Sequence, residues 1–138
     1  MMNNLIAIAQ SLSKFQLIEG TLKAFLAKHQ SDQAKVYKNS KKFYLVTEFN
    51  EMSYGILLKQ YKKICSDQSL WNRLFTLKEN RDYLAHRALI ANLNNIDDDF
   101  KKLLGVKPIL IDYVMLNKEL DECVDLMIEE YVLLLENT

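Results

Sequence analysis

The stretch NLIAIAQSLSKFQLIEGTLKAFLAKH, residues 4–29, has the pattern of a long amphipathic helix. Its apolar side chains recur every three or four residues over about seven turns. They are Leu5, Ile8, Leu12, Phe15, Ile18, Leu22, Phe25 and Leu26. Gly20 interrupts the pattern at a cost of about 1 kcal/mol relative to alanine, and we interpret it as a close helix crossing.

The same spacing predicts further helices downstream. One is expected over about residues 52–65, with Ser53 or Asn50 as its N-cap. The next is expected as one helix that begins after Asp67, carries apolar side chains inward as far as Leu89, and fades out over residues 92–95.

The C-terminal third of the chain is expected to end in another long helix. Asp97 and its neighbours open a short helical turn that ends at Gly105. Pro108 suits the first turn of the last helix, which runs to about Glu136. Residues 131–135 of that helix are apolar nearly all round, so they meet a second protomer or are buried within one chain.

Residues 30–50 are ambiguous in sequence. Ser31 and Asp32 are candidate caps of a short helix, residues 39–42 resemble a loop, and residues 43–47 have the composition of a strand. Because a single strand would have no partner here, we expect an irregular connection or a helical lead-in, mobile around residues 33–42.

Composition favours one all-α domain over residues 1–138. The 138 residues are 49% hydrophobic and include three glycines and one proline, too few turn-forming residues for a many-stranded β fold. We therefore predict an antiparallel up-and-down bundle of four to five helices, packed about 20° from parallel.

The formal net charge is zero, which argues against binding to nucleic acid through a global positive field. Residues 33–63 nevertheless hold seven lysines and two glutamates, a net charge of +5, whereas residues 97–138 hold eleven acids and four lysines, a net charge of −7. Two interpretations are open. Both charged segments form solvated helix faces, or the basic segment binds the phosphate backbone of RNA.

Cys65 and Cys123 are isolated, so a zinc site or a disulfide framework is not expected, and both are predicted to be reduced and partly buried. Trp71 and the seven tyrosines are expected at core or interface edges. The first residues lack a signal-peptide pattern and no apolar run reaches the length of a membrane span, so we expect a cytoplasmic protein without membrane contact.

Residues 81–86, RDYLAH, are the strongest candidate for a functional site. A guanidinium, a carboxylate and an imidazole lie here within about two turns of one predicted helix. Asp82 and His86 are four positions apart on nearly one face, so we expect the carboxylate to bond one ring nitrogen of the imidazole. That bond fixes the tautomer and leaves the other nitrogen to take or give a proton.

Arg81 and His86 lie about 140° apart around a straight helix, so one helix does not aim both at one atom. Either the Arg81 side chain curls round, or a two-fold axis brings a second copy of the helix alongside. A scissile phosphate in that cleft meets positive charge and a proton acceptor for the attacking 2′-hydroxyl, without a metal ion or cofactor.

Arg-x4-His with a polar residue after the arginine, on the third long helix of a small helical domain, resembles the HEPN superfamily. The resemblance implies a four-helix-bundle dimer whose composite site cleaves RNA without metal and leaves a cyclic phosphate end, in toxin–antitoxin or phage-defence systems. His86, Arg81 and Asp82 are then the catalytic residues, and Arg87, Lys78 and Lys23 are predicted to bind the substrate.

Two further positions bear on the resemblance. Glu19-x3-Lys23 is similar to a Glu-x3-Lys element of some HEPN families, although the same spacing also occurs as simple pairing on a helix surface. Ala88 stands where HEPN toxins paired with nucleotidyltransferase antitoxins carry tyrosine, so that kind of antitoxin is not implied. The role of that tyrosine is not transferred to Tyr83.

Other interpretations of the motif stay open. In one, Arg81 and Asp82 are exposed surface residues and His86 is a core-edge histidine bonded to a carbonyl. In another, the site binds RNA without cutting it. Three functions are therefore compared: a toxin-type endoribonuclease, a dimerising adaptor or regulatory partner, and a module that binds a nucleotide phosphate through Arg81. The absence of a phosphate-binding glycine loop and of paired metal-ligand carboxylates disfavours kinases, P-loop ATPases and two-metal nucleases.

Overall fold

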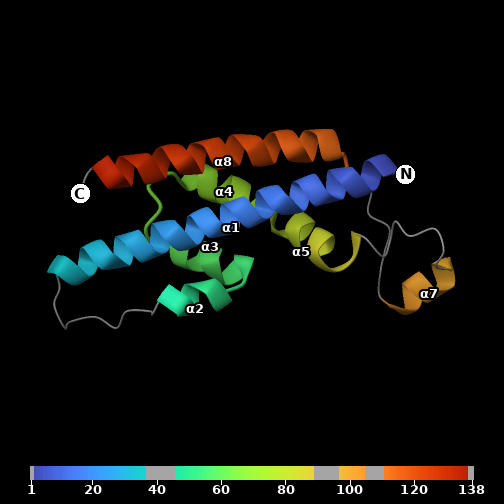
Figure 1. The fold of residues 1–138 in the computed structure, drawn as a ribbon, viewed down its shortest axis with the longest axis horizontal. Coiled ribbons are helices and arrows are strands. Elements are labelled where there is room, and N and C mark those ends of the chain that lie inside the picture. The colour runs from blue at the N-terminus through green and yellow to red at the C-terminus, as the bar shows by residue number, and fades with distance from the viewer. Residues whose placement is uncertain (1, 37–45, 89–96, 105–110, 137–138) are drawn as a thin grey trace.

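The computed structural model describes residues 2–36, 46–88, 97–104 and 111–136. Within these ranges every regular element is an α-helix, which confirms the all-α prediction. The helices are α1 (Met2–Val36), α2 (Val46–Glu51), α3 (Tyr54–Lys62), α4 (Gln68–Thr76), α5 (Lys78–His86), α7 (Asp98–Leu103) and α8 (Tyr113–Glu136) (Figure 1).

The two long helices, α1 and α8, lie side by side (Figure 1). The Asn117 amide nitrogen donates to the Ser11 hydroxyl at 3.1 Å, and Lys14 pairs with Asp121 at 3.0 Å. Because residue numbers rise together along the two helices, α1 and α8 run in the same direction.

The shorter helices pack on this pair and run in both directions. On α3, Tyr54 meets Phe15 edge to face at 6.0 Å between ring centroids, so α3 lies on α1. Helix α4, which follows α3, runs antiparallel to α8. Ser66, just before α4, bonds Glu130, and Arg73 on α4 bonds Glu119, so residue numbers rise along α4 as they fall along α8.

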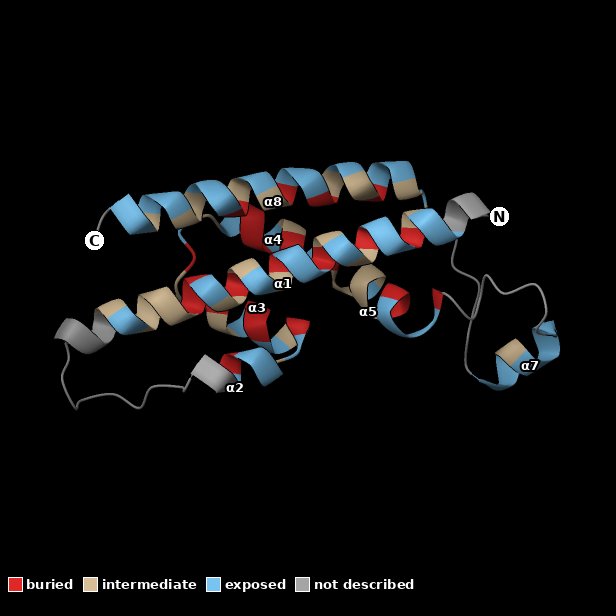
Figure 2. Cartoon of the chain, in the orientation of Figure 1, coloured by how far each residue is buried: buried red, intermediate tan, exposed pale blue. Residues whose placement is uncertain are grey.

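The core lies where α1, α3, α4, α5 and α8 face one another (Figure 2). Two buried tyrosines are hydrogen-bonded in this core: the Tyr54 hydroxyl donates to the Leu74 carbonyl at 2.7 Å, and the Tyr61 hydroxyl donates to Glu130 at 2.7 Å. The tyrosines thus bury their rings without leaving an unpaired hydroxyl. The largest fully buried side chains are Tyr54, Tyr61, Phe15, Ile8, Ile18, Leu22, Leu57, Leu58, Leu70, Leu74, Leu84 and Leu120.

The first helix is longer than predicted. It continues to Val36, so Ser31 and Asp32 lie inside it and do not cap a separate helix. Asp32 instead pairs with Lys28 at 3.0 Å. Residues 33–36, expected in an irregular connection, are helical, and α2 already begins at Val46, which fits the helical lead-in. The rest of the ambiguous segment, residues 37–45, lies outside the described residues.

The predicted single helix after Asp67 is in fact two helices. Asp67 caps α4 as expected, accepting a bond from the Leu70 amide at 3.0 Å. At Leu77 the backbone has φ −76° and ψ −8°, well away from the helical ψ of about −42°, and α5 begins at the next residue. Periodicity does not record such a break, because the apolar side chains on both sides remain inward.

The last helix begins later than predicted. Its first residue is Tyr113, and Asp112 caps it by accepting a bond from the Met115 amide at 3.1 Å. Pro108 and Gly105 lie outside the described residues. Asp97 caps α7 as expected, and α7 buries none of its residues (Figure 2).

Several apolar side chains stay on the surface of α8. Val132, Leu133 and Leu135 are exposed near its end, as are Val114 and Met115 near its start. One chain therefore does not bury this apolar surface. In the described part of the chain, no helix has the length and apolar character needed to span a bilayer.

Candidate functional site

Helix α5 positions the RDYLAH segment against the core. Tyr83 and Leu84 are buried and hold the helix in place, which leaves Arg81, Asp82 and His86 at its sides. The motif therefore lies on a packed helix, whose orientation is fixed by its two apolar residues.

Arg81 is bound to α1. Its Nε donates to the Glu19 carboxylate at 2.7 Å, and the two side chains are only 22% and 16% exposed. Partial burial strengthens such a charged hydrogen bond, so the guanidinium is held at one place on the surface of α1. The Glu19 partner belongs to the Glu-x3-Lys element that the sequence singled out.

Asp82 pairs with Lys78, one turn before it, at 2.8 Å. Its other neighbour is the Arg81 guanidinium at 3.8 Å. No bond joins Asp82 to His86 in the described part of the chain, so the predicted carboxylate–imidazole pair is not formed. Both Lys78 and Asp82 side chains are more than 40% exposed, at 41% and 44%, and such a pair is weak and open to exchange.

His86 is the last residue of α5 and is exposed. Its ring has no hydrogen bond or ion pair to any residue that the structure describes. The alternative prediction, a core-edge histidine bonded to a carbonyl, is therefore wrong, and the ring is open to solvent and to a ligand.

The three residues predicted to bind substrate lie apart from one another. Arg87 is exposed at the C-cap of α5, and Lys78 begins the same helix. Lys23 is on α1, where its Nζ donates to the Asn50 carbonyl of α2 at 3.3 Å. The Lys78 side chain pairs with Asp82 of the motif, whereas Arg87 contacts the motif through its backbone amide, which donates to the Tyr83 carbonyl at 2.8 Å.

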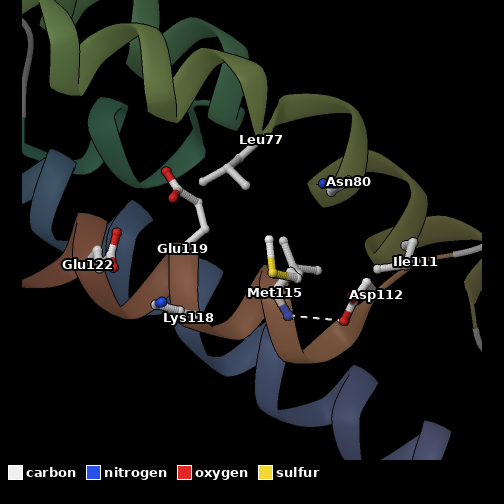
Figure 3. A pocket seen from close by; sticks show the side chains of 9 residues that line it. Leu77, Asn80, Ile111, Asp112, Met115, Lys118, Glu119 and Glu122 are labelled. Carbon is white, nitrogen blue, oxygen red and sulfur yellow. Dashed lines mark hydrogen bonds between the residues drawn. The ribbon is translucent and has the colours of Figure 1, made fainter.

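A pocket of about 520 Å³ lies between α8 and the junction of α4 and α5 (Figure 3). Asp112, Glu119 and Glu122 line it, with Lys118 as the one basic side chain on its wall. Arg73 bonds Glu119 through two nitrogens, at 2.6 and 2.8 Å, and the bonds to Arg73 lower the pKa of Glu119. Because acidic side chains outnumber basic ones on its walls, this pocket does not suit a phosphate.

A smaller pocket of about 210 Å³ lies between α3, α4 and the start of α5, and the sequence did not predict it. Trp71, Phe75, Lys59 and Lys78 are among its lining residues. The available signal was Phe75, which falls outside the apolar stripe of α4 formed by Leu70, Trp71 and Leu74. Single exposed apolar side chains are common on protein surfaces, so this signal alone does not indicate a site.

No protein-family model matches the chain, and comparisons with curated proteins and with solved structures found no match. Membership of the HEPN superfamily therefore stays a prediction carried by the motif and by its position on α5.

Proposed function

We propose that this chain is a HEPN-like, metal-independent endoribonuclease whose site is completed when two copies associate. The observation that carries the proposal is the contrast between two residues of one helix. Arg81 is fixed by Glu19 in a partly buried position, whereas His86 is exposed and unbonded to the described residues. Phosphodiester cleavage by general acid–base catalysis requires a cation held in place and an accessible imidazole, and each copy of the chain supplies these two groups on different sides of α5.

Each residue has a stated role in this proposal. His86 takes the proton from the attacking 2′-hydroxyl, and the oxygen then bonds the adjacent phosphorus. The bond from phosphorus to the 5′-oxygen breaks, the leaving oxygen takes a proton from water, and His86 releases its proton to solvent. A 2′,3′-cyclic phosphate remains on the upstream fragment. Arg81 stabilises the extra negative charge on the phosphate oxygens in the transition state. Asp82 does not orient His86 directly, and its contribution is to hold Lys78 beside the motif.

Two copies are required because one chain does not bring Arg81 and His86 together. They lie about 140° apart around α5, and Arg81 is turned to Glu19 on α1. A two-fold axis next to α5 places His86 of one copy near Arg81 of the other. The exposed apolar side chains of α8, among them Val114 and Val132, supply surface for such an association.

The helix directions support the bundle that this proposal assumes. With α4 and α5 taken as one segment, α1, α2, α3, α4–α5 and α8 alternate in direction along the chain (Figure 1). An up-and-down bundle of five segments would have the same alternation, with its fifth segment parallel to its first.

Complementation between two inactive variants tests the composite site. Arg81→Ala and His86→Ala chains are co-expressed with different tags and the mixed dimer is purified. One of its two sites then holds an intact Arg81 and an intact His86, so it recovers about half of the wild-type rate. A mixed dimer as inactive as either variant contradicts the composite site.

A non-catalytic dimerising adaptor is the second candidate. It is favoured by the pairing of Arg81 with Glu19 and of Asp82 with Lys78, because both charges of the motif are then neutralised within the chain. The adaptor predicts a stable dimer that never cuts RNA, whereas a toxin-type nuclease predicts growth arrest on expression that His86→Ala relieves. An antitoxin or regulatory protein would hold such a nuclease inactive.

A further inference from the structure

Helix α4 carries a fixed aromatic stack that ends at the surface. The rings of Trp71 and Phe75 are nearly parallel, at 14°, with centroids 5.1 Å apart. Trp71 is 8% exposed, and its indole nitrogen donates to the Leu58 carbonyl at 2.8 Å, which fixes the ring. Phe75, by contrast, is 53% exposed, so its ring offers open surface at the end of the stack.

Positive charge surrounds this stack. Lys59 and Lys78 line the adjoining pocket of about 210 Å³, and the Lys62 ammonium lies 4.6 Å from the Trp71 ring centroid. Gly55 makes room for the Lys78 side chain, because a β-carbon at position 55 would lie 3.0 Å from Cε of Lys78. Lys78 therefore lies across the start of α3, at the edge of the pocket.

An exposed aromatic ring among lysines is the arrangement that binds unpaired bases. A base stacks on the ring with little preference for sequence, and the ammonium groups bind the flanking phosphates. A duplex keeps its bases stacked on one another and offers no free face to a single ring. We infer that Phe75, with Lys59, Lys62 and Lys78, forms a binding site for a base and its neighbouring phosphates in single-stranded RNA.

This inference rests on the proposed ribonuclease function and names the form of its substrate. Lys78, Asp82 and His86 follow one another at four-residue spacing along α5, winding slowly round one side of the helix. The eight steps from Lys78 to His86 span about 12 Å along the helix axis. An RNA strand bound at Phe75 therefore extends past Lys78 towards His86, and the site positions the strand for cleavage.

Binding of an unstructured, fluorescently labelled RNA oligonucleotide tests the inference by anisotropy. All proteins carry His86→Ala, so that no RNA is cut during the measurement. Phe75→Leu removes the aromatic face and is expected to weaken binding about tenfold, whereas Phe75→Tyr keeps the face and binds like the parent. The matched control is Phe100→Leu, which removes a similarly exposed ring from α7 and is expected to bind like the parent.

Two further measurements separate stacking from charge. Trp71 is the only tryptophan of the chain, so RNA bound on Phe75 is expected to change its fluorescence. Lys59→Gln is expected to weaken binding and to reduce the slope of log K against log salt by about 0.7, the value for one phosphate contact on a single strand. Lys118→Gln, an exposed lysine on α8, is the charge-matched control.

The outcomes distinguish this site from the catalytic proposal. Equal RNA binding by Phe75→Leu and the parent overturns the inference, as does tighter binding of duplex than of single-stranded RNA, or no RNA binding at all. RNA that binds in a Phe75-dependent way but is never cut by the wild-type chain leaves this site standing and overturns the nuclease. RNA that is cut equally well by the Phe75→Leu variant of the wild-type chain overturns the site alone.

Discussion

Arg81 on α5 and Glu19 on α1 form a partly buried ion pair, with 2.7 Å between Nε and the carboxylate oxygen. The two residues are far apart in sequence, and their bond ties the motif helix to the longest helix of the fold. It fixes the position of the guanidinium, and it also sets the direction in which Arg81 faces a ligand.

Removing one partner of this pair is expected to destabilise the fold. Glu19→Gln leaves the Arg81 charge partly buried without its counter-ion, so the free energy of unfolding falls by about 1–2 kcal/mol, between the values for exposed and buried pairs. Urea denaturation of Glu19→Gln, Arg81→Gln and the double variant measures the coupling, expected at about 1 kcal/mol. If the loss of unfolding free energy in the double variant equals the sum of the two single losses, the result contradicts an interaction between Glu19 and Arg81.

Arg73 is expected to control stability in acid. Its bonds to Glu119 lower the pKa of that carboxyl below its ordinary value of 4.5, so the stabilisation is present above about pH 4.5 and is lost as the pH falls through the folded-state pKa. Arg73→Met removes this part of the pH dependence and costs about 1 kcal/mol at neutral pH. Urea unfolding from pH 3 to 7 measures it, with Lys118→Met as the control, and an unchanged acid slope in Arg73→Met argues against the account.

Tyr61 is expected to contribute to loss of stability in alkali. Burial first, and then the bond to Glu130 among other contacts, raise the pKa of Tyr61 above its ordinary value of 10.0. The unfolded chain therefore loses this proton first, and the free energy of unfolding falls as the pH rises above about 10. Tyr61→Phe reduces that fall but costs about 1 kcal/mol at neutral pH for the lost hydrogen bond. Thermal unfolding from pH 8 to 11 measures both effects, and an alkaline slope equal to that of the wild type contradicts them.

Both cysteines are expected to be unreactive in the folded protein. Cys65 and Cys123 are free and buried, and burial is the first cause that raises both pKa values, that of Cys123 to about 12. Since the thiolate is the reactive form, a thiol reagent at pH 8 should label neither residue until the chain unfolds. Rapid labelling of Cys123 in the native state would show that α8 opens from the bundle.

The fold class was predictable from sequence because periodicity reports which side chains are buried. The pattern of residues 4–29 predicted α1, and the caps Asp67 and Asp97 lie where their sequence context placed them. Periodicity did not predict the break at Leu77, because a bend that keeps apolar residues inward leaves the pattern intact. It also did not show that the last helix begins at Tyr113. Asp112 is a good N-cap, but Pro108 suits the first turn of a helix equally well, and the apolar pattern does not distinguish the two starts.

The candidate site was predictable only in part. Sequence identified Arg81, Asp82 and His86. The four-residue spacing favoured a bond between Asp82 and His86, one turn later, whereas Asp82 pairs with Lys78, one turn earlier. The Arg81 partner, Glu19, lies on a different helix, and one sequence gives no register between helices. Phe75 was missed for the same reason, because its role depends on lysines that α3 and α5 bring to it.

Cleavage of single-stranded RNA by the purified chain in excess EDTA, wild type beside His86→Ala, tests the central claim most directly. The account predicts that the wild type cuts the RNA and leaves 2′,3′-cyclic phosphate ends, and that His86→Ala does not cut. Cleavage by His86→Ala at the wild-type rate, or intact RNA with the wild type, would contradict it.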